Sequence, residues 1–357
     1  MTKPDLLIPA AGKSSRFPNM RPKWMLTHPD GNLMLVSSCK GLDLSLVKNI
    51  YVTILREHIE RYDCADSIVE AFEELGVSKR VKVLALDEST SCQAETVSKT
   101  IEHFGLDGPI FIKDADSYFS TDISIENSVC VFDLGNMNHV HACNKSFVQC
   151  NDQLSIVNIV EKKVISSTFC VGGYSFACAN DFYESFKEFI LESEEVYVSH
   201  VIYRMILGDH QFKARPVKDF LDWGTLKDWN RYKSSFSSLF IDIDGVLIYS
   251  SSKYFSPKWG ETDAIPKNIE KINQLYDTGR VKIILTTSRT TSHRDITQKQ
   301  LARCGIKYHQ IVYNLWHAQR VIINNYSKSN TYRSCDAINI VRDSPDLTEM
   351  LESILEH

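Results

Sequence analysis

The sequence lacks the features that mark disulfide scaffolds, zinc modules and membrane proteins. Its ten cysteines are scattered, without a Cys-x-x-Cys pair or the spacing of a metal site. No apolar run approaches the roughly 20 residues that a membrane-spanning helix needs. No segment before the first apolar run has the form of a signal peptide. We therefore expect reduced, mostly buried thiols in a cytoplasmic protein without a membrane span.

Charge and length exclude a second group of functions. The formal net charge of −5 over 357 residues provides no chain-wide attraction to nucleic acid, so we expect no nucleic-acid partner. The length is sufficient for two domains that each bury a core of their own. We find no internal repeat and no low-complexity tract.

Short apolar runs alternate with amphipathic stretches along most of the chain. This alternation is typical of an α/β fold in which helices cover both faces of a mainly parallel sheet. The expected strands are residues 5–9, 49–55, 81–86, 109–113, 129–133 and 169–176, and the expected helices are residues 67–75, 95–104 and 181–191.

A second α/β unit is expected to begin near residue 235. Residues 230–238 are polar and rich in serine, which is typical of a linker or a first turn. We therefore predict two domains, residues 1–234 and residues 235–357. In the second, the expected strands are residues 239–244, 281–285 and 321–323, and the expected helices are residues 267–275 and 295–303.

The loop after the first expected strand is the first candidate site. Residues 10–17 read AAGKSSRF, and residues 21–23 read RPK. A loop of small residues lets backbone N–H groups approach a phosphate chain, and a following helix N-terminus adds its positive end. Arg16 would neutralise a polyphosphate as a planar fork and Lys23 as a point charge. The alternative is a strand, turn and helix whose small residues only allow tight packing.

Two carboxylates, Asp114 and Asp116, follow the expected strand at residues 109–113. Because one residue separates them, we expect both to leave the same face at the carboxyl end of the strand, where open α/β sheets bind ligands. Two neighbouring carboxylates at the end of a buried strand raise the free energy of the fold unless a cation compensates their charge. Mg²⁺ suits the position, since it binds one or two carboxylates together with phosphate oxygens. The alternative is a solvated turn.

Together with three other segments, these motifs resemble the sugar-phosphate nucleotidyltransferases, GT-A-like pyrophosphorylases that activate sugars as nucleotide diphosphates. The other segments are SCQAETV at residues 91–97, VEK at residues 160–162 followed by VGGYSF at residues 171–176, and LDWGT at residues 221–225. The resemblance covers nearly all of residues 5–229, in the family's order. It implies a three-layer domain with a mixed, mainly parallel sheet.

The resemblance also implies roles for single residues. Arg16, Lys23 and Lys162 would be the catalytic cations, with Lys162 at the phosphate of the acceptor sugar, and Mg²⁺ would bind Asp116 and Asp222. Ordinary alternatives remain for two segments: a helix N-terminus at residues 91–97 and a solvated surface pair at residues 161–162. The residues that would contact the substrates are Ala11, Gly12 and Ser15 at the triphosphate, Gln93 at the base, and Glu161 and Gly173 at the acceptor.

In the implied reaction, the phosphate oxygen of a sugar or polyol phosphate attacks the α-phosphate of a nucleoside triphosphate in line and releases pyrophosphate. Because this nucleophile is already an anion, catalysis depends on positioning and charge neutralisation. A glycosyltransferase is the alternative enzyme, since Asp114-Ala115-Asp116 also fits its Asp-x-Asp motif. A glycosyltransferase uses a finished sugar nucleotide, however, and has no pyrophosphate for residues 10–23 to bind.

A second pair of carboxylates ends the expected strand at residues 239–244. Asp242-Ile243-Asp244-Gly245 and the segment ILTTSR at residues 284–289 resemble the first two motifs of the haloacid-dehalogenase-like phosphatases. The resemblance implies a Rossmann-like domain in which Asp242 forms an aspartyl-phosphate, Asp244 acts as acid and base, and Thr286 binds the phosphoryl group. The short stretch between the motifs leaves no room for a large cap.

The later motifs of that family are altered. Asn324 and Asn325 follow the expected strand at residues 321–323, where active members have acidic metal ligands, and the usual lysine is missing. Asparagine can bind Mg²⁺ through its carbonyl but adds no charge, so Mg²⁺ at Asp242, Asp244 and Asn325 would be held weakly. Asp343 and Lys307 are candidate substitutes. The alternative is a non-catalytic domain that serves binding or assembly.

These interpretations predict a Mg²⁺-dependent enzyme for surface polysaccharide precursors (capsule or lipopolysaccharide), with a phosphatase domain that acts on a related intermediate. The expected partners are a nucleoside triphosphate and a sugar or polyol phosphate. The sequence leaves open the base, the sugar and whether the chain forms a homo-oligomer.

Overall fold

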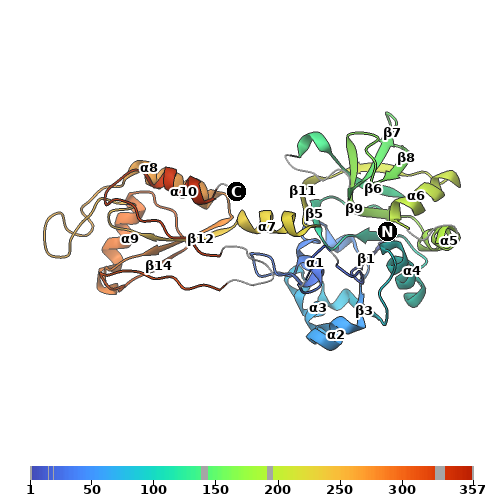
Figure 1. Cartoon of the computed structure of the whole chain (residues 1–357), viewed down its shortest axis with the longest axis horizontal. Helices are drawn as coiled ribbons and strands as arrows, with labels where there is room; N and C mark the ends of the chain where they lie inside the picture. Colours follow the sequence, from blue (N-terminus) through green and yellow to red (C-terminus); the bar gives the residue numbers. More distant parts are fainter. Residues whose placement is uncertain are drawn as a thin grey trace. The chain divides into compact units, whose positions relative to one another are not determined.

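The computed structural model describes residues 2–14, 16–18, 20–137, 144–190, 196–325 and 334–355. The chain divides into two compact units, residues 1–228 and residues 229–357, drawn from blue to green and from yellow to red in Figure 1. The division lies inside helix α7 (Leu226–Ser234), ahead of the predicted boundary. Much of the expected linker is therefore helical. Within the described ranges, no helix is long and apolar enough to cross a membrane.

The first unit is built on a mixed sheet with the strand order β10-β6-β9-β4-β1-β2-β3, and β7 and β8 join it beside β9. The neighbours β4, β1, β2 and β3 are parallel, whereas β9 runs antiparallel to β4 and β6. The strands are β1 (Asp5–Pro9), β2 (Ile50–Leu55), β3 (Val81–Leu86), β4 (Ile110–Lys113), β6 (Ser128–Asp133), β7 (Ser146–Cys150), β8 (Ile156–Glu161), β9 (Thr168–Phe176) and β10 (Lys213–Pro216).

Helices cover both faces of this sheet, which gives the expected three layers (Figure 1). Leu6 and Ile8 of β1 pack with α1 and α3 on one face, and Leu7 packs with α4, α5 and α6 on the other. Successive strand residues point to opposite faces, so a central strand must be apolar throughout. The helices are α1 (Met34–Ser37), α2 (Arg56–Tyr62), α3 (Ala65–Ala71), α4 (Gln93–Phe104), α5 (Ala179–Ile190) and α6 (Val198–Leu207).

The second unit contains a parallel sheet with the order β12-β13-β14. Its core joins Ile241 and Ile283 of the sheet to Ile272 of α8, Leu301 of α9 and Leu351 of α10. Residues 243–265, between β12 and α8, form isolated bridges but no helix or strand. The elements are β12 (Ser237–Asp242), α8 (Pro266–Asp277), β13 (Val281–Thr286), α9 (Arg294–Arg303), β14 (Gln310–Val312) and α10 (Leu347–Leu355).

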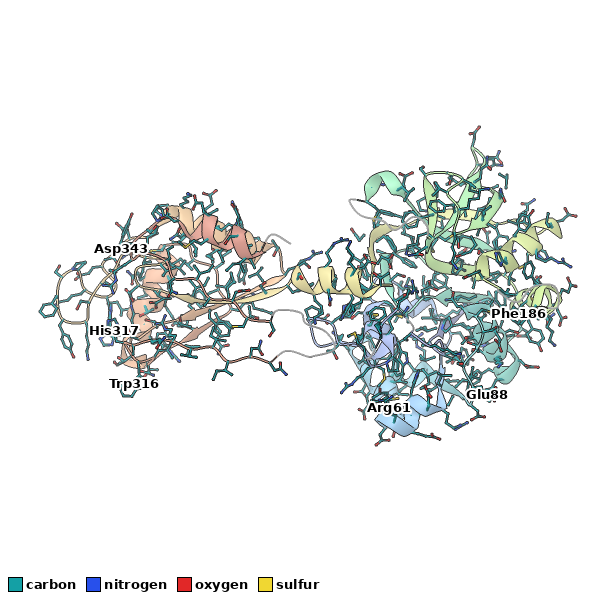
Figure 2. All side chains as sticks on the ribbon, viewed as in Figure 1. Arg61, Glu88, Phe186, Trp316, His317 and Asp343 are labelled. Atoms are coloured by element: carbon teal, nitrogen blue, oxygen red, sulfur yellow. The ribbon has the colours of Figure 1, made fainter. Side chains whose placement is uncertain are left out.

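The strand expected at residues 321–323 is wrong. Val321 and Ile323 are 72% and 92% exposed, and the segment has no regular structure. Trp316 nearby is also exposed (Figure 2). The third strand is β14, which follows α9 directly and pairs with β13. Val321, Ile322 and Ile323 are β-branched and therefore resemble a buried strand. Such a run forms a strand only where a neighbouring strand can pair with it, and the sequence pattern does not show whether one is present.

Candidate active site

The loop between β1 and the 3-10 turn η1 (Lys23–Met25) carries the first predicted residues. Buried Ala11 fixes its start, and the Ser14 hydroxyl accepts a hydrogen bond from the backbone N–H of Lys23 (3.1 Å). At Gly12, no atom lies within 4 Å of the position that a Cβ would take, so the loop is open there. The loop leads into a three-residue 3-10 turn, so the expected helix N-terminus is absent and contributes no dipole.

Two predicted cations of this loop meet Asp116. The Lys23 ammonium forms an ion pair with Asp116 Oδ2, and Arg16 Nη2 lies 4.0 Å from the same oxygen. The Arg16 side chain is 56% exposed and therefore has freedom to turn towards a ligand. Ser15 lies outside the described residues.

The two carboxylates after β4 have different partners. Residues 114–116 turn the chain into the short strand β5 (Ser117–Ser120). Asp114 accepts a hydrogen bond from the side-chain amide of Gln93 and lies against Gly172, where a Cβ would come within 2.3 Å of Asp114 Oδ2. Asp116 faces Lys23. Burial and the charge on Asp116 nevertheless raise the pKa of Asp114, so the two carboxylates lie near each other. Their common face stays a prediction, because a turn and not a strand carries them.

Lys113, the last residue of β4, is fully buried beneath this turn. Its ammonium donates to the carbonyl oxygens of Asp114 (2.8 Å) and Ser117 (2.7 Å) and to the Ser117 hydroxyl (3.0 Å). Burial lowers the pKa of Lys113, while the nearby Asp114 acts in the opposite direction. Three acceptors match the three N–H bonds of the ammonium, so Lys113 fixes the conformation of the turn.

Asp222 lies close to Asp116, although the two residues are far apart in the sequence. It ends strand β11 (Lys218–Asp222), which pairs with β5 so that Asp222 lies opposite Ser117. A Cβ on Gly224 would be 3.0 Å from Asp222 Oδ1, 3.2 Å from Asp116 Oδ2 and 3.5 Å from Arg16 Nη1. These two carboxylate oxygens therefore lie within about 6 Å of each other. The structure brings together the two aspartates that the sequence predicted as metal ligands.

Lys145 is a cation of this site that sequence reasoning missed. Its ammonium forms an ion pair with Asp222 Oδ2, and its side chain is 17% exposed. It lies 5.5 Å from the centre of the Phe220 ring. Lys145 directly precedes β7 and belongs to no motif; the pairing of β7 with β8 and β9 brings it to Asp222. No local sequence signal marks this contact.

The cations determine the charge of Asp116. Burial favours its protonated form, but Lys23, Arg16 and Lys145 outweigh burial and hold the pKa of Asp116 well below its usual range. For Asp114, burial and the charge on Asp116 raise the pKa, against the hydrogen bond from Gln93. The surrounding cations therefore favour the ionised form of Asp116 more than that of Asp114.

Glu161 ends β8 beside a shallow hollow of about 360 Å³, which is also lined by His200 and Tyr203. Its carboxylate accepts hydrogen bonds from the Ser199 hydroxyl (2.6 Å) and from Ser146. Both serines hold the carboxylate at the edge of this hollow, where a hydroxyl of a ligand can reach it.

Lys162 and Gly173, also predicted at the acceptor, have other contacts. The Lys162 ammonium donates to the Tyr197 hydroxyl. At Gly173, a Cβ would lie 2.6 Å from the Phe119 ring and 2.9 Å from the sulfur of Cys130. The structure thus requires this glycine for close packing under β9.

In the second unit, Asp242 and Thr286 are neighbours. They lie opposite each other at the carboxyl ends of the parallel strands β12 and β13. Asp242 Oδ1 accepts hydrogen bonds from Arg320 Nη2 (3.1 Å) and from the backbone N–H of Ile243 (3.0 Å). This is the edge of an α/β sheet at which ligands bind.

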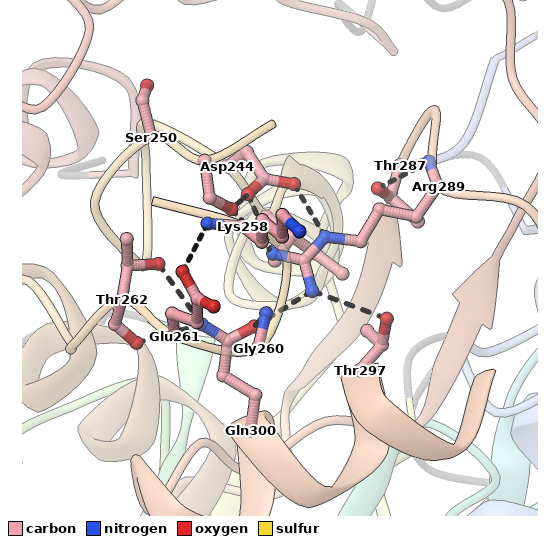
Figure 3. Close-up of polar contacts among 12 residues, drawn as sticks. Asp244, Ser250, Lys258, Gly260, Glu261, Thr262, Thr287, Arg289, Thr297 and Gln300 are labelled. Carbon is pink, nitrogen blue, oxygen red and sulfur yellow. Dashed lines mark hydrogen bonds and ion pairs between the residues drawn. The ribbon is translucent and has the colours of Figure 1, made fainter. Parts of the chain in front are cut away.

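Asp244 is held by a buried arginine (Figure 3). Arg289 Nε and Nη2 donate to its two carboxylate oxygens at 2.8 and 2.7 Å. The other N–H groups of Arg289 reach Ser251 (3.2 Å), Thr297 (3.3 Å) and Gln300 (2.8 Å). Every guanidinium N–H is thus matched, and both oxygens of Asp244 are engaged. A group that exchanges protons with a substrate is not expected to be bound in this way.

Asn324 and Asn325 form hydrogen bonds with Ser334. Both are exposed. The Asn324 side chain donates to the carbonyl oxygen of Ser334 (3.0 Å), and the Ser334 hydroxyl donates to the carbonyl oxygen of Asn325 (2.5 Å). The strand expected just before them is absent, but Arg320 of the same segment contacts Asp242, and the role of Asn325 as a metal ligand stays a prediction.

The two candidate substitutes differ. Lys307 pairs with Asp277 (2.7 Å) and precedes β14, at the end of the parallel sheet opposite to Asp242. Its predicted substitution for the motif lysine is therefore wrong. Asp343 lies beside the loop after β12, where its backbone N–H donates to the carbonyl oxygen of Gly245 (2.8 Å).

The first site fits a magnesium ion, and the second does not. Within the described ranges, no cluster of three or more His, Cys, Asp or Glu side chains could hold a metal ion. Mg²⁺, however, commonly uses one or two carboxylates and takes its other ligands from phosphate and water. Asp116 and Asp222 meet that need. The expected set Asp242, Asp244 and Asn325 does not, because Arg289 engages both oxygens of Asp244 and Arg320 pairs with Asp242.

No family model and no curated protein matches this chain. Solved structures match it. A nucleoside-diphosphate-sugar pyrophosphorylase from Vibrio cholerae RC9 superposes with a TM-score of 0.55 at 21% identity, covering 64% of this chain and 98% of that one. The inositol-1-phosphate CTP transferase from T. maritima gives 0.52 at 16% identity, covering 64% and 92%. A UDP-glucose pyrophosphorylase complexed with UDP-glucose gives 0.51 at 13%, covering 66% and 98%.

The share of the chain covered is close to that of residues 1–228. The likeness shows that the chain contains the fold of these nucleotidyltransferases.

Proposed function

We propose that the first unit transfers a nucleotidyl group from a nucleoside triphosphate to a sugar or polyol phosphate and releases pyrophosphate. The observation that carries this proposal is the convergence of Asp116, Asp222 and Arg16 on one point beside Gly224. Lys23 and Lys145 add two further cations. Solved proteins of this fold are named as sugar pyrophosphorylases and as a CTP transferase, which supports the proposal.

Binding of the triphosphate follows from charge and access. The open loop at Gly12 admits a phosphate chain, and Arg16 and Lys23 neutralise it. Asp116 and Asp222 would hold Mg²⁺, which when bound supplies further charge neutralisation at the phosphate oxygens. Lys113 holds the turn that carries Asp116, so the carboxylate needs little reorganisation during the reaction.

The acceptor side consists of Glu161 and Lys162. Glu161 accepts a hydroxyl of the sugar or polyol at the hollow that it lines, and Lys162 attracts the acceptor phosphate. No general base is required, because the attacking phosphate oxygen is already an anion. The chain contributes by aligning that oxygen with the α-phosphate.

Pyrophosphate release tests the proposal. The full chain is incubated with Mg²⁺, each of the four nucleoside triphosphates and a panel of sugar and polyol phosphates. We expect release that requires both substrates and is lost in Asp222→Asn. Transfer from a finished sugar nucleotide, without pyrophosphate release in any combination, would instead identify a glycosyltransferase.

For the second unit, we propose phosphate binding at Asp242 and Thr286, with phosphatase activity of the haloacid-dehalogenase type on an intermediate related to the acceptor. The register of β12 and β13 supports this. In such a reaction, Asp242 displaces the alcohol from the phosphoryl group, and water then hydrolyses the aspartyl-phosphate to inorganic phosphate. The ion pair between Asp244 and Arg289 predicts slow turnover at best.

Phosphate release by the full chain from sugar phosphates and bisphosphates tests this second proposal, with Asp242→Asn as the control. Release that depends on Asp242 supports a phosphatase. No release above the Asp242→Asn background would contradict catalysis and favour a role in binding or assembly.

We further propose that the product is a precursor for a surface polysaccharide, made in the cytoplasm. Nucleotide-activated sugars and polyols are the form in which such building blocks are joined. All nine cysteines among the described residues are free thiols, and a reducing compartment keeps thiols in that state. Incorporation of the labelled product into surface polysaccharide tests the assignment.

A further inference from the structure

Two lysines occupy the two carboxylates at which we propose that a metal ion binds. Lys23 pairs with Asp116, and Lys145 pairs with Asp222. Each pair joins segments that are far apart in the sequence. Both pairs are largely screened from solvent, since the four side chains are between 15% and 23% exposed.

We propose that Lys145 and a divalent cation compete for Asp222, and that Lys145 transfers its contact from this carboxylate to a phosphate oxygen when cation and triphosphate bind together. This inference rests on the proposed nucleotidyltransferase function. It assigns to Lys145 a role in coupling the binding of the metal to that of the polyphosphate.

Charge balance is the first argument. With Lys23 on Asp116 and Lys145 on Asp222, the two carboxylates are neutralised by the protein's own cations. A divalent cation that binds alone must displace the Lys145 ammonium from Asp222, and the neighbouring carboxylate, Asp116, is already paired with Lys23. Charge interactions are strong in this partly buried site, so the displacement is costly. A triphosphate supplies a further anion. The cation can then bind the carboxylate, and the ammonium can bind a phosphate.

Geometry is the second argument. Lys145 lies over the Phe220 ring, which provides an apolar surface for its methylene groups to pack against. The positive charge of Lys145 acts on both aspartates. Lys145 forms an ion pair with Asp222 and also helps to lower the pKa of Asp116. A lysine side chain has four flexible methylene groups, so its ammonium can move between neighbouring anions without a change in the backbone.

A metal-binding experiment without turnover tests the proposal. Binding of Mn²⁺ is measured by water-proton relaxation enhancement, which responds to protein-bound Mn²⁺ far more than to Mn²⁺ in a small complex. Inorganic tripolyphosphate replaces the nucleotide, so the unknown base does not matter. The variants are Lys145→Met and, in case methionine disturbs the fold, Lys145→Gln. Thermal unfolding checks that each is folded.

Lys162→Met is the matched control. The backbone N–H of Lys162 donates to the carbonyl oxygen of Lys145 (3.0 Å), so both lysines lie in the same hairpin, but the Lys162 ammonium contacts the Tyr197 hydroxyl. The control removes one positive charge from the hairpin while leaving the pair at Asp222 intact.

We expect Mn²⁺ alone to bind the Lys145 variants about tenfold or more tightly than the wild type, because its competitor is gone. Tripolyphosphate should strengthen Mn²⁺ binding much more in the wild type than in these variants. Lys162→Met should bind Mn²⁺ alone like the wild type. Unchanged or weaker binding of Mn²⁺ alone by the Lys145 variants would overturn the proposal, as would an equal gain in Lys162→Met.

The test remains separate from the proposed function. A chain that couples Mn²⁺ to tripolyphosphate through Lys145 but releases no pyrophosphate would contradict the nucleotidyltransferase and leave the coupling intact. A chain that turns over normally with uncoupled binding would contradict only the role of Lys145.

Discussion

At the scale of single residues, Gly224 leaves the space in which the two aspartates and Arg16 meet. An added Cβ would lie 3.0 Å from Asp222 Oδ1 and 3.2 Å from Asp116 Oδ2. We expect Gly224→Ala to slow pyrophosphate release about tenfold or more, since a small misplacement of charged groups is costly in catalysis. The free energy of unfolding should change by less than about 1 kcal/mol, because the crowded atoms are side-chain ends.

The control for this substitution is Gly108→Ala, at a position where a Cβ would have no neighbour within 4 Å. Activity and the unfolding midpoint are measured for both variants. Equal activity of Gly224→Ala and Gly108→Ala would contradict the position of the site.

Asp114 predicts a pH dependence of stability. Because burial raises its pKa in the folded state, the native protein loses stability as pH rises from the usual carboxylate pKa of about 3.9 to the raised value. Asp114→Asn cannot ionise and keeps an oxygen that can accept from Gln93. We expect the variant to be more stable than the wild type at pH 7, with the difference shrinking towards pH 4.

Denaturant unfolding at both pH values measures this effect. A variant that is less stable than the wild type at pH 7 would show that the charge on Asp114 stabilises the fold, contrary to our account.

Residues differ in how far the sequence reveals them. Asp116 and Asp222 could be predicted, since each ends an apolar segment within a recognisable motif. Lys145 and Arg289 could not, because their contacts depend on strand pairing and on packing between distant segments. Gln93 was predicted at a base and contacts Asp114 in the structure; its contact with a base remains a prediction.

At the scale of elements, the six strands predicted for the first unit are present, with ends that differ by at most one residue. Most of them are buried apolar runs, the clearest strand signal; β3 is the exception, with only Leu84 buried. Strands β5, β7, β8, β10 and β11 were not predicted; β5 and β11 are short and largely polar. Yet their pairing delivers Asp222 to the site. In the second unit, the strand predicted at residues 321–323 is wrong, because an apolar run does not show whether a neighbouring strand is available to pair with it.

The contact between Arg289 and α9 yields a prediction about the second unit. Arg289 ties the loop after β12 to Thr297 and Gln300 of α9. We expect Arg289→Met to destabilise this unit by about 3–5 kcal/mol, because it leaves the Asp244 carboxylate without its partner. Arg289→Lys keeps the charge but loses the planar fork, so its loss should be smaller.

Denaturant unfolding of the full chain measures these losses, and pyrophosphate release reports on the first unit in the same samples. A loss below about 1 kcal/mol for Arg289→Met would contradict the importance of this ion pair.

At the scale of the whole molecule, the division of the chain predicts independent folding. The boundary lies within α7, and only Ser235 and Phe236 separate this helix from β12. We expect limited proteolysis to cut near residues 231–238 and to release a folded fragment that retains the first sheet. Circular dichroism and thermal unfolding of the purified fragment check this. A cut that unfolds both halves would contradict two independent units.

The most direct test of the central claim is the rate of pyrophosphate release by Lys23→Ala. Lys23 pairs with Asp116 at the mouth of the open loop, so it contributes charge at the polyphosphate more than packing. We predict a rate about 10²–10³-fold below that of the wild type in a variant that remains folded at the assay temperature, which thermal unfolding checks, with the exposed Lys48→Ala as the control. Normal turnover by a folded Lys23→Ala would contradict the assignment of this loop and its aspartates as the triphosphate site.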